Sequence, residues 1–203
     1  MRTEFWRRLR DVLGERYAIA PEQGERLAAH WEHLERWNRR INLTAIRDME
    51  TAVVRHYAES VALAMEIAAG RWRVLDVGSG AGFPGFPFAV VRPECEVILL
   101  ESDVRKAVFL EESTAGTANC RVLNDRLERV SIRCDWLISR AVSRMDLAGG
   151  IGRLADRIGL LVSATGAAEW AKEIEVEKDV TLLFRPEAHV LVGRTRRSEP
   201  GTA

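Results

Sequence analysis

The stretch DVGSGAGFPG, residues 76–85, follows the apolar run RWRVL (71–75), which is typical of a short buried strand. Four of its ten residues are glycine. Glycines at this density directly after a strand indicate that a ligand approaches the backbone closely. We therefore expect a strand, a ligand-binding loop and a helix in direct succession.

From residue 71 onward, short apolar runs alternate with helical ones. This alternation predicts an α/β fold, with a mostly parallel sheet and helices on both faces. The last two strands are separated only by RPEA (185–188), so we expect them to form an antiparallel hairpin at the sheet edge. The expected strands are RVLDV (73–77), EVILLE (96–101), CRVLN (120–124), CDWLISR (134–140), GLLVSA (159–164), VTLLF (180–184) and HVLVGR (189–194). The helical stretches between them are 83–91, 103–115, a short turn at 126–130, and 145–158.

The first 70 residues show helical periodicity. Apolar residues recur at three- and four-residue steps within 4–17 and 22–42, and Asp48 can cap a third helix over 49–70. We therefore divide the chain into a helical segment (1–70) packed on the core, a sheet domain (71–197) and a polar, disordered tail (198–203).

Composition narrows the class of protein. The 30 basic and 30 acidic residues cancel, which argues against binding nucleic acid through overall charge. No apolar run reaches the ~18 residues of a membrane span, and the N-terminus lacks the apolar segment of a secretory signal. Three scattered cysteines, Cys95, Cys120 and Cys134, indicate free thiols in a reducing cytosol and no metal site. We expect a cytoplasmic monomer.

Two ligands compete for the glycine loop. GAGFPG (80–85) matches the dinucleotide fingerprint G-x-G-x-x-G, whereas DVGSGAG (76–82) is similar to the S-adenosylmethionine loop of methyltransferases. The carboxylate of Asp76 would repel a pyrophosphate, and Pro84 lacks one of the N–H groups that would bind it at a helix start. S-adenosylmethionine instead carries a sulfonium and an ammonium cation, so the loop favours it. Glu101, which ends the next strand, suits a ribose diol in either case.

Six segments together match the pattern of one family. They are WNRRINLTAI (37–46), VRHYAESVAL (54–63), VLDVGSGAGFPGFPFAV (74–90), LLESDVRKAVFL (99–110), NDRLE (124–128) and LISRAV (137–142). In order and spacing they resemble the bacterial small-subunit ribosomal RNA guanine-N7 methyltransferases, the RsmG (GidB) family. The resemblance extends over about residues 30–145, and the WN-x-x-x-NLT segment makes it far more specific than the glycine loop alone.

The resemblance implies a class I S-adenosylmethionine-dependent methyltransferase fold, with a Rossmann-like sheet. The implied reaction moves a methyl group from S-adenosylmethionine to N7 of one guanine in 16S ribosomal RNA, with that RNA or the small ribosomal subunit as partner. N7 already carries a lone pair, so no general base is required and catalysis by orientation is sufficient. The segment SRAV (139–142) lacks the Asp/Asn-Pro-Pro-aromatic motif expected of exocyclic amine methylases, and no cysteine follows a proline as in C5-pyrimidine methylases.

Site residues follow from the resemblance position by position. Besides Asp76 and Glu101, the expected cofactor-binding residues are Gly78, Gly80 and Phe83 of the loop, and Leu127 and Glu128, which bracket the adenine. Arg140 is the expected catalytic residue, contacting the cofactor carboxylate or an RNA phosphate unless it serves a structural ion pair. Asn38, Arg55 and His56 match positions that contact RNA or pack between domains.

Towards the C-terminus the sequence departs from the family pattern. The segment VSATG (162–166) lacks the lysine expected in a form like ALKG, and PEAHVLV (186–192) lacks the arginine expected before the final strand. Two alternatives therefore stay open. One is a divergent paralogue that binds S-adenosylmethionine but has a changed acceptor or no activity. The other is a nicotinamide-dependent oxidoreductase that uses the GAGFPG turn.

Overall fold

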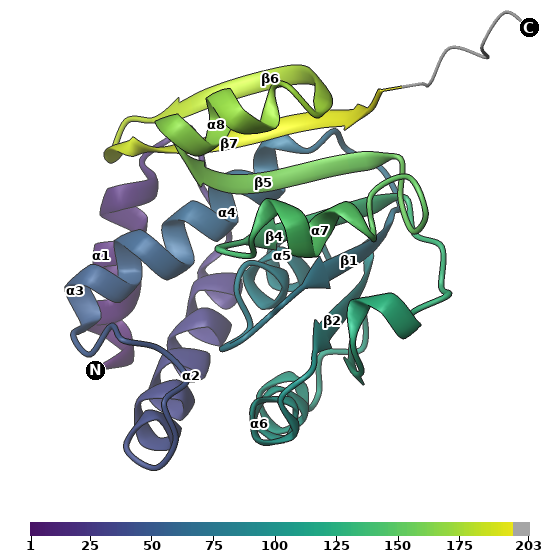
Figure 1. Cartoon of the computed structure of the whole chain (residues 1–203). Helices are drawn as coiled ribbons and strands as arrows, with labels where there is room; N and C mark the ends of the chain where they lie inside the picture. Colours follow the sequence, from purple (N-terminus) through teal and green to yellow (C-terminus); the bar gives the residue numbers. More distant parts are fainter. Residues whose placement is uncertain (197–203) are drawn as a thin grey trace, which may run out of the picture.

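The computed structural model describes residues 1–196, so the tail expected at 198–203 lies outside the described residues. A seven-stranded sheet forms its centre, in the order β3-β2-β1-β4-β5-β7-β6 (Figure 1). The first five strands of the chain run parallel, and β7 is antiparallel to both β5 and β6, so the expected edge hairpin is present. The strands are β1 (Arg73–Val77), β2 (Glu96–Glu101), β3 (Cys120–Asn124), β4 (Trp136–Arg140), β5 (Arg157–Ser163), β6 (Ile174–Leu182) and β7 (Arg185–Thr195).

Helices cover both faces of this sheet. One apolar core joins the N-terminal helices, α5 and α6 to one face, and a second core joins α7 and α8 to the other. The helices are α1 (Arg2–Leu13), α2 (Pro21–Asn38), α3 (Met49–Ala52), the π-helix η1 (Val53–Ala58), α4 (Glu59–Glu66), α5 (Gly85–Val91), α6 (Val104–Thr114), the 3₁₀ turn η2 (Leu127–Arg129), α7 (Arg144–Ala148) and α8 (Ala164–Trp170).

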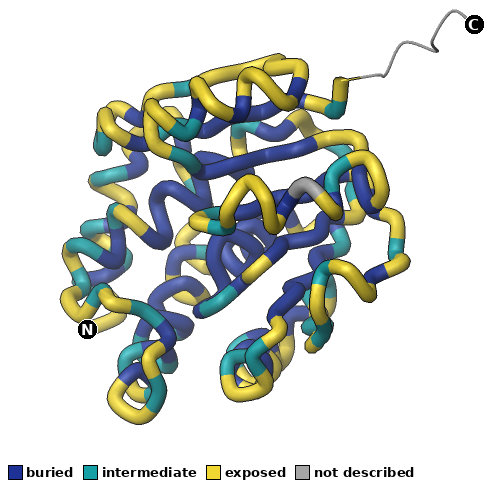
Figure 2. The backbone as a smooth tube through the Cα atoms, in the orientation of Figure 1, coloured by how far each residue is buried: buried dark blue, intermediate teal, exposed yellow. Residues whose placement is uncertain are grey.

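Alternation along the strands divides the apolar residues between the two cores. In β1, Val74 faces the N-terminal helices, whereas Leu75 and Val77 face α7 and α8. Figure 2 shows the result as a continuous buried centre through β1, β2, α4 and α5. Strands buried on both faces are near-continuous apolar runs, which is why they were recognisable in the sequence.

Four helix predictions were wrong in extent, and those over 4–17 and 22–42 end at Leu13 and Asn38. The helix expected over 145–158 ends at Ala148, and Arg157 and Ile158 belong to β5. Glycines interrupt it, and Gly152 adopts φ +74°, a left-handed conformation that a helix does not allow. The helix expected over 49–70 ends at Glu66 and is divided by η1, where Glu59 N–H bonds to the Val54 carbonyl five residues back.

The hairpin also differs from its prediction. Its turn lies at 183–184 instead of RPEA, and β6 begins at Ile174, six residues earlier than expected. Pro186 is tolerated in β7 because it falls in an irregular part of the ladder, where neither neighbouring strand pairs with it. The position of the turn is thus set by the pairing of β6 with β7, and not by Pro186.

Candidate cofactor and acceptor site

The glycine loop lies between the carboxyl end of β1 and the start of α5. Gly78, Gly80 and Gly82 all have positive φ angles, which permits the tight path of the loop. The N–H groups of Gly78 and Ser79 both donate to the carbonyl of Leu100, at 3.0 Å each. The loop is therefore anchored to the end of β2, at the edge where parallel α/β sheets bind ligands.

The carboxylates of Asp76 and Glu101 accept hydrogen bonds from backbone N–H groups of the glycine loop and of the first residue of α5. Asp76 is fully buried, and its Oδ2 accepts from the Gly85 N–H at 2.9 Å, at the first residue of α5. Burial, aided by Glu101, raises the pKa of Asp76 to about 7, and Oδ1 has no partner among the described residues. Glu101 accepts from the Gly80 N–H at 2.9 Å and from the Asp103 N–H at 2.8 Å. Both acids expected to bind cofactor are thus bonded to the backbone around the loop.

A cleft of about 260 Å³ opens beside Gly78 at the carboxyl ends of β1, β2 and β4. A Cβ on Gly78 would lie 2.6 Å from Val142 Cγ2, so glycine keeps the cleft open at this point. Leu127 and Glu128 of η2, the two residues expected to bracket the adenine, line it, whereas Gly80 is not among its lining residues. The full lining is Val77, Gly78, Leu100, Ser102, Asp125, Arg126, Leu127, Glu128, Val142 and Asp146.

The character of this cleft fits S-adenosylmethionine. Leu100, Leu127 and Val142 offer apolar walls to a flat base, and acids outnumber the single base, Arg126. A surplus of carboxylates attracts the sulfonium and ammonium cations of S-adenosylmethionine and repels a pyrophosphate. The donor set therefore suits the methyl donor better than a dinucleotide.

Phe83 lies away from this cleft. Its ring stacks on His56, with centroids 4.4 Å apart and an angle of 12°, and meets the edge of Tyr57 at 5.0 Å. His30 completes the cluster by stacking on Phe86 of α5 at 4.5 Å. Phe83 thus connects the glycine loop to the N-terminal helices in this structure.

Arg140, at the end of β4, points towards the same helices. Its Nη1 donates to the Arg55 carbonyl and to His56 Nδ1, the latter at 2.9 Å. Its Nε lies 3.8 Å from Glu59 Oε2. Burial lowers the pKa of Arg140 while Glu59 opposes the shift, so the guanidinium remains charged. The structure places Arg140 in an internal network of acceptors.

Of the three residues expected at the RNA or between domains, two are buried. Asn38 accepts from the N–H groups of Leu43 and Thr44 and donates to the Thr44 carbonyl, which fixes the NLT segment. His56 bonds to Thr44 Oγ1 through Nε2 at 2.9 Å. Burial, followed by the Arg140 charge, lowers the pKa of His56 to about 3. Arg55 differs from both, because its side chain is exposed to solvent.

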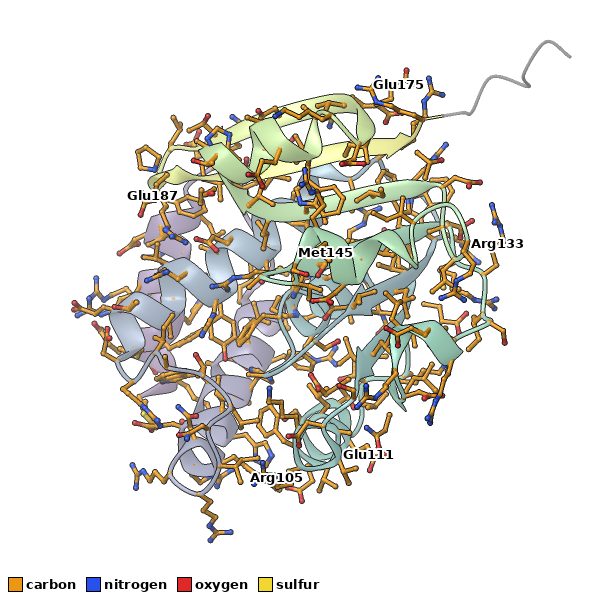
Figure 3. All side chains as sticks on the ribbon, in the orientation of Figure 1. Arg105, Glu111, Arg133, Met145, Glu175 and Glu187 are labelled. Carbon is orange, nitrogen blue, oxygen red and sulfur yellow. The ribbon has the colours of Figure 1, made fainter. Side chains whose placement is uncertain are left out.

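A second cavity, of about 450 Å³, adjoins the first, and Val142 lines both. Four arginines line it: Arg55, Arg140, Arg144 and Arg185. Ala141, between β4 and α7, also lines it and has φ +58°, a backbone strain that is found preferentially at functional sites. Glu187 of β7, which is labelled in Figure 3, also lines this cavity.

Comparison with known proteins identifies the family. A family model described as "rRNA small subunit methyltransferase G" (GidB) matches residues 23–195. The chain belongs to this family. Among curated members, it is 36% identical over 160 residues to the ribosomal RNA small subunit methyltransferase G of Neisseria meningitidis serogroup C (strain 053442), covering 77% of each chain. It is 38% identical over 168 residues to the protein of the same name from Bordetella avium (strain 197N), covering 78% of this chain and 74% of that one.

Solved structures agree with this family in fold. A SAM-dependent methyltransferase from Aquifex aeolicus has a TM-score of 0.57 at 13% identity, covering 72% of this chain and 93% of that chain. TYW2 of P. horikoshii, solved with MeSAdo, has a TM-score of 0.53 at 18% identity, covering 70% and 63%. The predicted Rossmann-like methyltransferase fold is confirmed.

Four residues that line the two cavities were not predicted from the sequence. Glu59, Arg144, Asp146 and Arg185 all line one of the two cavities. Glu59 had a detectable signal, because it is an acid within the apolar run of residues 57–64. Arg185 did not, since it lies 126 residues away and meets Glu59 only through the fold of β7.

Within residues 1–196, no cluster of three or more His, Cys, Asp or Glu side chains is arranged to hold a metal ion. Over the same residues, no helix combines the length and hydropathy that crossing a membrane requires.

Proposed function

We propose that this protein transfers the methyl group of S-adenosylmethionine to N7 of a guanine in 16S ribosomal RNA. As a member of the GidB family, it is an S-adenosylmethionine-dependent rRNA methyltransferase. One observation supports the finer proposal most strongly. The acid-lined cleft beside Gly78 shares a wall, Val142, with the arginine-lined cavity beside Arg140.

On the donor side, the proposed contacts are those of the cleft. Leu127 and Leu100 enclose the adenine, and Glu128 or Asp125 accepts hydrogen bonds from the ribose or the amino group. Asp76 and Glu101 fix the conformation of the loop, a role supported by the hydrogen bonds that they accept from the Gly85 and Gly80 N–H groups. When bound, S-adenosylmethionine supplies an electrophilic methyl group on a sulfonium.

On the acceptor side, the chain's task is orientation. Guanine N7 has a free lone pair, so no residue has to remove a proton. Guanine O6 and the RNA phosphates are hydrogen-bond acceptors, which match the guanidinium groups of Arg55, Arg140 and Arg144. The segment VSATG contributes Val162, Ser163 and Gly166 to the cavity wall, so arginines and not a lysine supply its positive charge.

This proposal places the protein in the cytoplasm as a monomer acting on the small ribosomal subunit or its RNA. The absence of a membrane-spanning helix among residues 1–196 is compatible with that partner. Neutral overall charge implies that a local arginine-rich surface directs the RNA contact.

A transfer assay with purified protein tests the function. Labelled S-adenosylmethionine is incubated with small subunits, or with their naked RNA, from cells that lack the protein, and digested nucleosides are analysed. We expect label in 7-methylguanosine. Arg140→Ala should reduce its formation by about 100-fold while far-UV circular dichroism stays unchanged. Label in another nucleoside would contradict the acceptor, and undiminished turnover in Arg140→Ala would contradict the role of that residue.

A thermal-shift measurement separates the alternatives. S-adenosylhomocysteine should raise the melting temperature and NAD should not, because only the former lacks a pyrophosphate. Stabilisation by NAD alone would favour an oxidoreductase. Stabilisation by S-adenosylhomocysteine without methyl transfer to either RNA form would favour a paralogue with a changed acceptor or no activity.

A further inference from the structure

The guanidinium of Arg140 is held by one short segment of the N-terminal region. It donates hydrogen bonds to the Arg55 carbonyl and to His56 Nδ1, and its Nε forms an ion pair with Glu59 Oε2 at 3.8 Å. All three lie in or directly after η1, whose π-helical turn accommodates one more residue than an α-helical turn. The Arg140 side chain is only 17% exposed. These three contacts therefore determine where its guanidinium lies in the wall of the arginine-lined cavity.

His56 is itself fixed on three sides. An arginine can only donate hydrogen bonds, so Nδ1 of His56 must be the acceptor and Nε2 must carry the proton. That Nε2–H donates to Thr44 Oγ1, which also accepts from the Ile46 N–H. The ring face stacks on Phe83 at 4.4 Å. The NLT segment and the glycine loop therefore set the orientation of the His56 ring, and the contact with Arg140 sets its tautomer.

We propose that His56 is a positioning residue for methyl transfer, whose Nδ1 fixes the Arg140 guanidinium beside the acceptor guanine. This inference rests on the proposed function. It assigns to His56 a hydrogen-bonding role, in addition to the packing of its ring. The hydrogen bond and the packing can be separated by substitution.

Two substitutions retain opposite parts of the histidine. His56→Asn keeps an acceptor, Oδ1, bonded to Cγ where histidine has Nδ1, but it loses the ring and the Thr44 contact. His56→Phe keeps a ring of similar size stacked on Phe83 but offers Arg140 no acceptor. If His56 positions Arg140, activity follows the acceptor. If His56 only fills space, activity follows the ring.

Steady-state methylation of small subunits provides the test, with wild type measured first. We expect His56→Phe to lower kcat by about 10- to 100-fold, the effect of one hydrogen bond to a charged group. His56→Asn should lose no more than about fivefold. Affinity for S-adenosylhomocysteine, measured by calorimetry, should change by less than about threefold in either variant, because His56 does not line the donor cleft.

The double variant His56→Phe/Arg140→Ala tests the coupling. If His56 acts through Arg140, adding His56→Phe to Arg140→Ala should change kcat by less than about twofold. A further loss of the same size as in the wild-type background would overturn the proposal. So would full activity in His56→Phe, or a greater loss in His56→Asn than in His56→Phe.

A spectroscopic measurement keeps the proposal testable even where a variant is poorly folded. In ¹⁵N-histidine-labelled wild type, His56 should show the Nε2–H tautomer, and its Nδ1 resonance should shift in Arg140→Ala as that hydrogen bond is lost. An unchanged Nδ1 resonance would overturn the proposal. Wild-type protein that transfers no methyl group would instead contradict the proposed function, so the two failures are distinguishable.

Discussion

Gly78 and Gly80 lie two residues apart in the same loop, and both have left-handed φ angles, +72° and +58°. Their surroundings differ. A Cβ on Gly78 would meet Val142 at 2.6 Å at the edge of the cleft proposed to bind the methyl donor, whereas a Cβ on Gly80 would find only the Gly78 carbonyl, at 3.8 Å. Gly78 therefore leaves space beside Val142 at the edge of the cleft, and Gly80 allows the chain to turn.

Alanine at each position should separate these effects. Both Gly78→Ala and Gly80→Ala impose a left-handed alanine, costing about 1–2 kcal/mol of stability and a few degrees in melting temperature. Only Gly78→Ala should also weaken S-adenosylhomocysteine binding, by about tenfold or more, because the new methyl group forces Val142 into the cleft. Equal affinities for the two variants, measured by titration calorimetry, would show that the cleft is not the donor site.

At this scale, residue types were predictable from the sequence but their partners were not. The positions of Asp76 and Glu101 at strand ends followed from the apolar runs before them. Their bonds to the N–H groups of Gly85 and Gly80 did not, because these depend on the path of the loop. Phe83 was likewise assigned to the cofactor by position, whereas its ring lies on His56.

Among the elements, α2 and η1 each insert one histidine beneath the glycine loop. His30 is fully buried against Phe86, and its Nδ1 bonds to the Tyr57 hydroxyl at 2.7 Å. Burial lowers the pKa of both His30 and His56 to about 3, from 6.5. On the strand side, burial raises the pKa of Asp76 from 3.8 to about 7. Burial therefore keeps the two histidines deprotonated and Asp76 protonated further from their ordinary pKa values.

This opposition predicts how stability depends on pH between about 4.5 and 6. In this range His30 is protonated in the unfolded chain but neutral in the folded one. His30 therefore makes the free energy of unfolding fall as the pH is lowered. His30→Phe should reduce that slope by about 1 kcal/mol per pH unit. The measurement is the free energy of unfolding in urea at several pH values, and an unchanged slope would contradict the buried, neutral histidine.

Asp76→Asn should change the slope in the other direction. The folded protein holds a proton on Asp76 that the unfolded chain has released, so wild-type Asp76 makes stability rise as the pH is lowered. Removing it should steepen the loss of stability towards acid by about 1 kcal/mol per pH unit. Asparagine keeps an acceptor for the Gly85 N–H, which limits other changes. An unchanged slope in the same urea experiment would show that Asp76 is ionised in the fold.

The elements best predicted were those whose burial pattern is set locally. Strands β1 to β3 match their expected bounds to the residue, because each contains adjacent apolar residues and pairs in parallel with its neighbours. The π-helix η1 was not recognised in the sequence, because it is defined by a backbone hydrogen bond, from the Glu59 N–H to the Val54 carbonyl. Its stabilising contacts to Arg140 come from 80 or more residues away.

For the molecule as a whole, residues 1–70 complete one face of the sheet. Helix α5 is buried along its full length, and α2 and α4 both contact it. Phe5 of α1 is fully buried and meets Tyr57 edge-on at 4.8 Å. The N-terminal helices and the sheet therefore share one core.

Removal of the helical segment should consequently unfold the remainder. A fragment of residues 71–196 would expose the apolar surface of α5 and lose the cluster beneath the glycine loop. We expect it to lack a cooperative urea transition and to bind S-adenosylhomocysteine no more tightly than a denatured control. A fragment with native-like circular dichroism and cooperative unfolding would show that the sheet domain folds independently.

The overall architecture followed from the sequence because strand–helix alternation permits few topologies. The shape of the arginine-lined cavity did not follow, because its walls come from η1, α4, β4, α7, β5, α8 and β7. Only the fold brings Arg55, Arg140 and Arg185 to one place, across 130 residues of chain.

Chemical mapping of ribosomal RNA tests the central claim most directly. Small-subunit RNA is isolated from cells with and without this protein, reduced with borohydride and cleaved with aniline, a treatment that cuts at 7-methylguanosine. The account predicts one cleavage site that is present with the protein, absent without it and not restored by Arg140→Ala. Identical cleavage patterns in the two strains would contradict it.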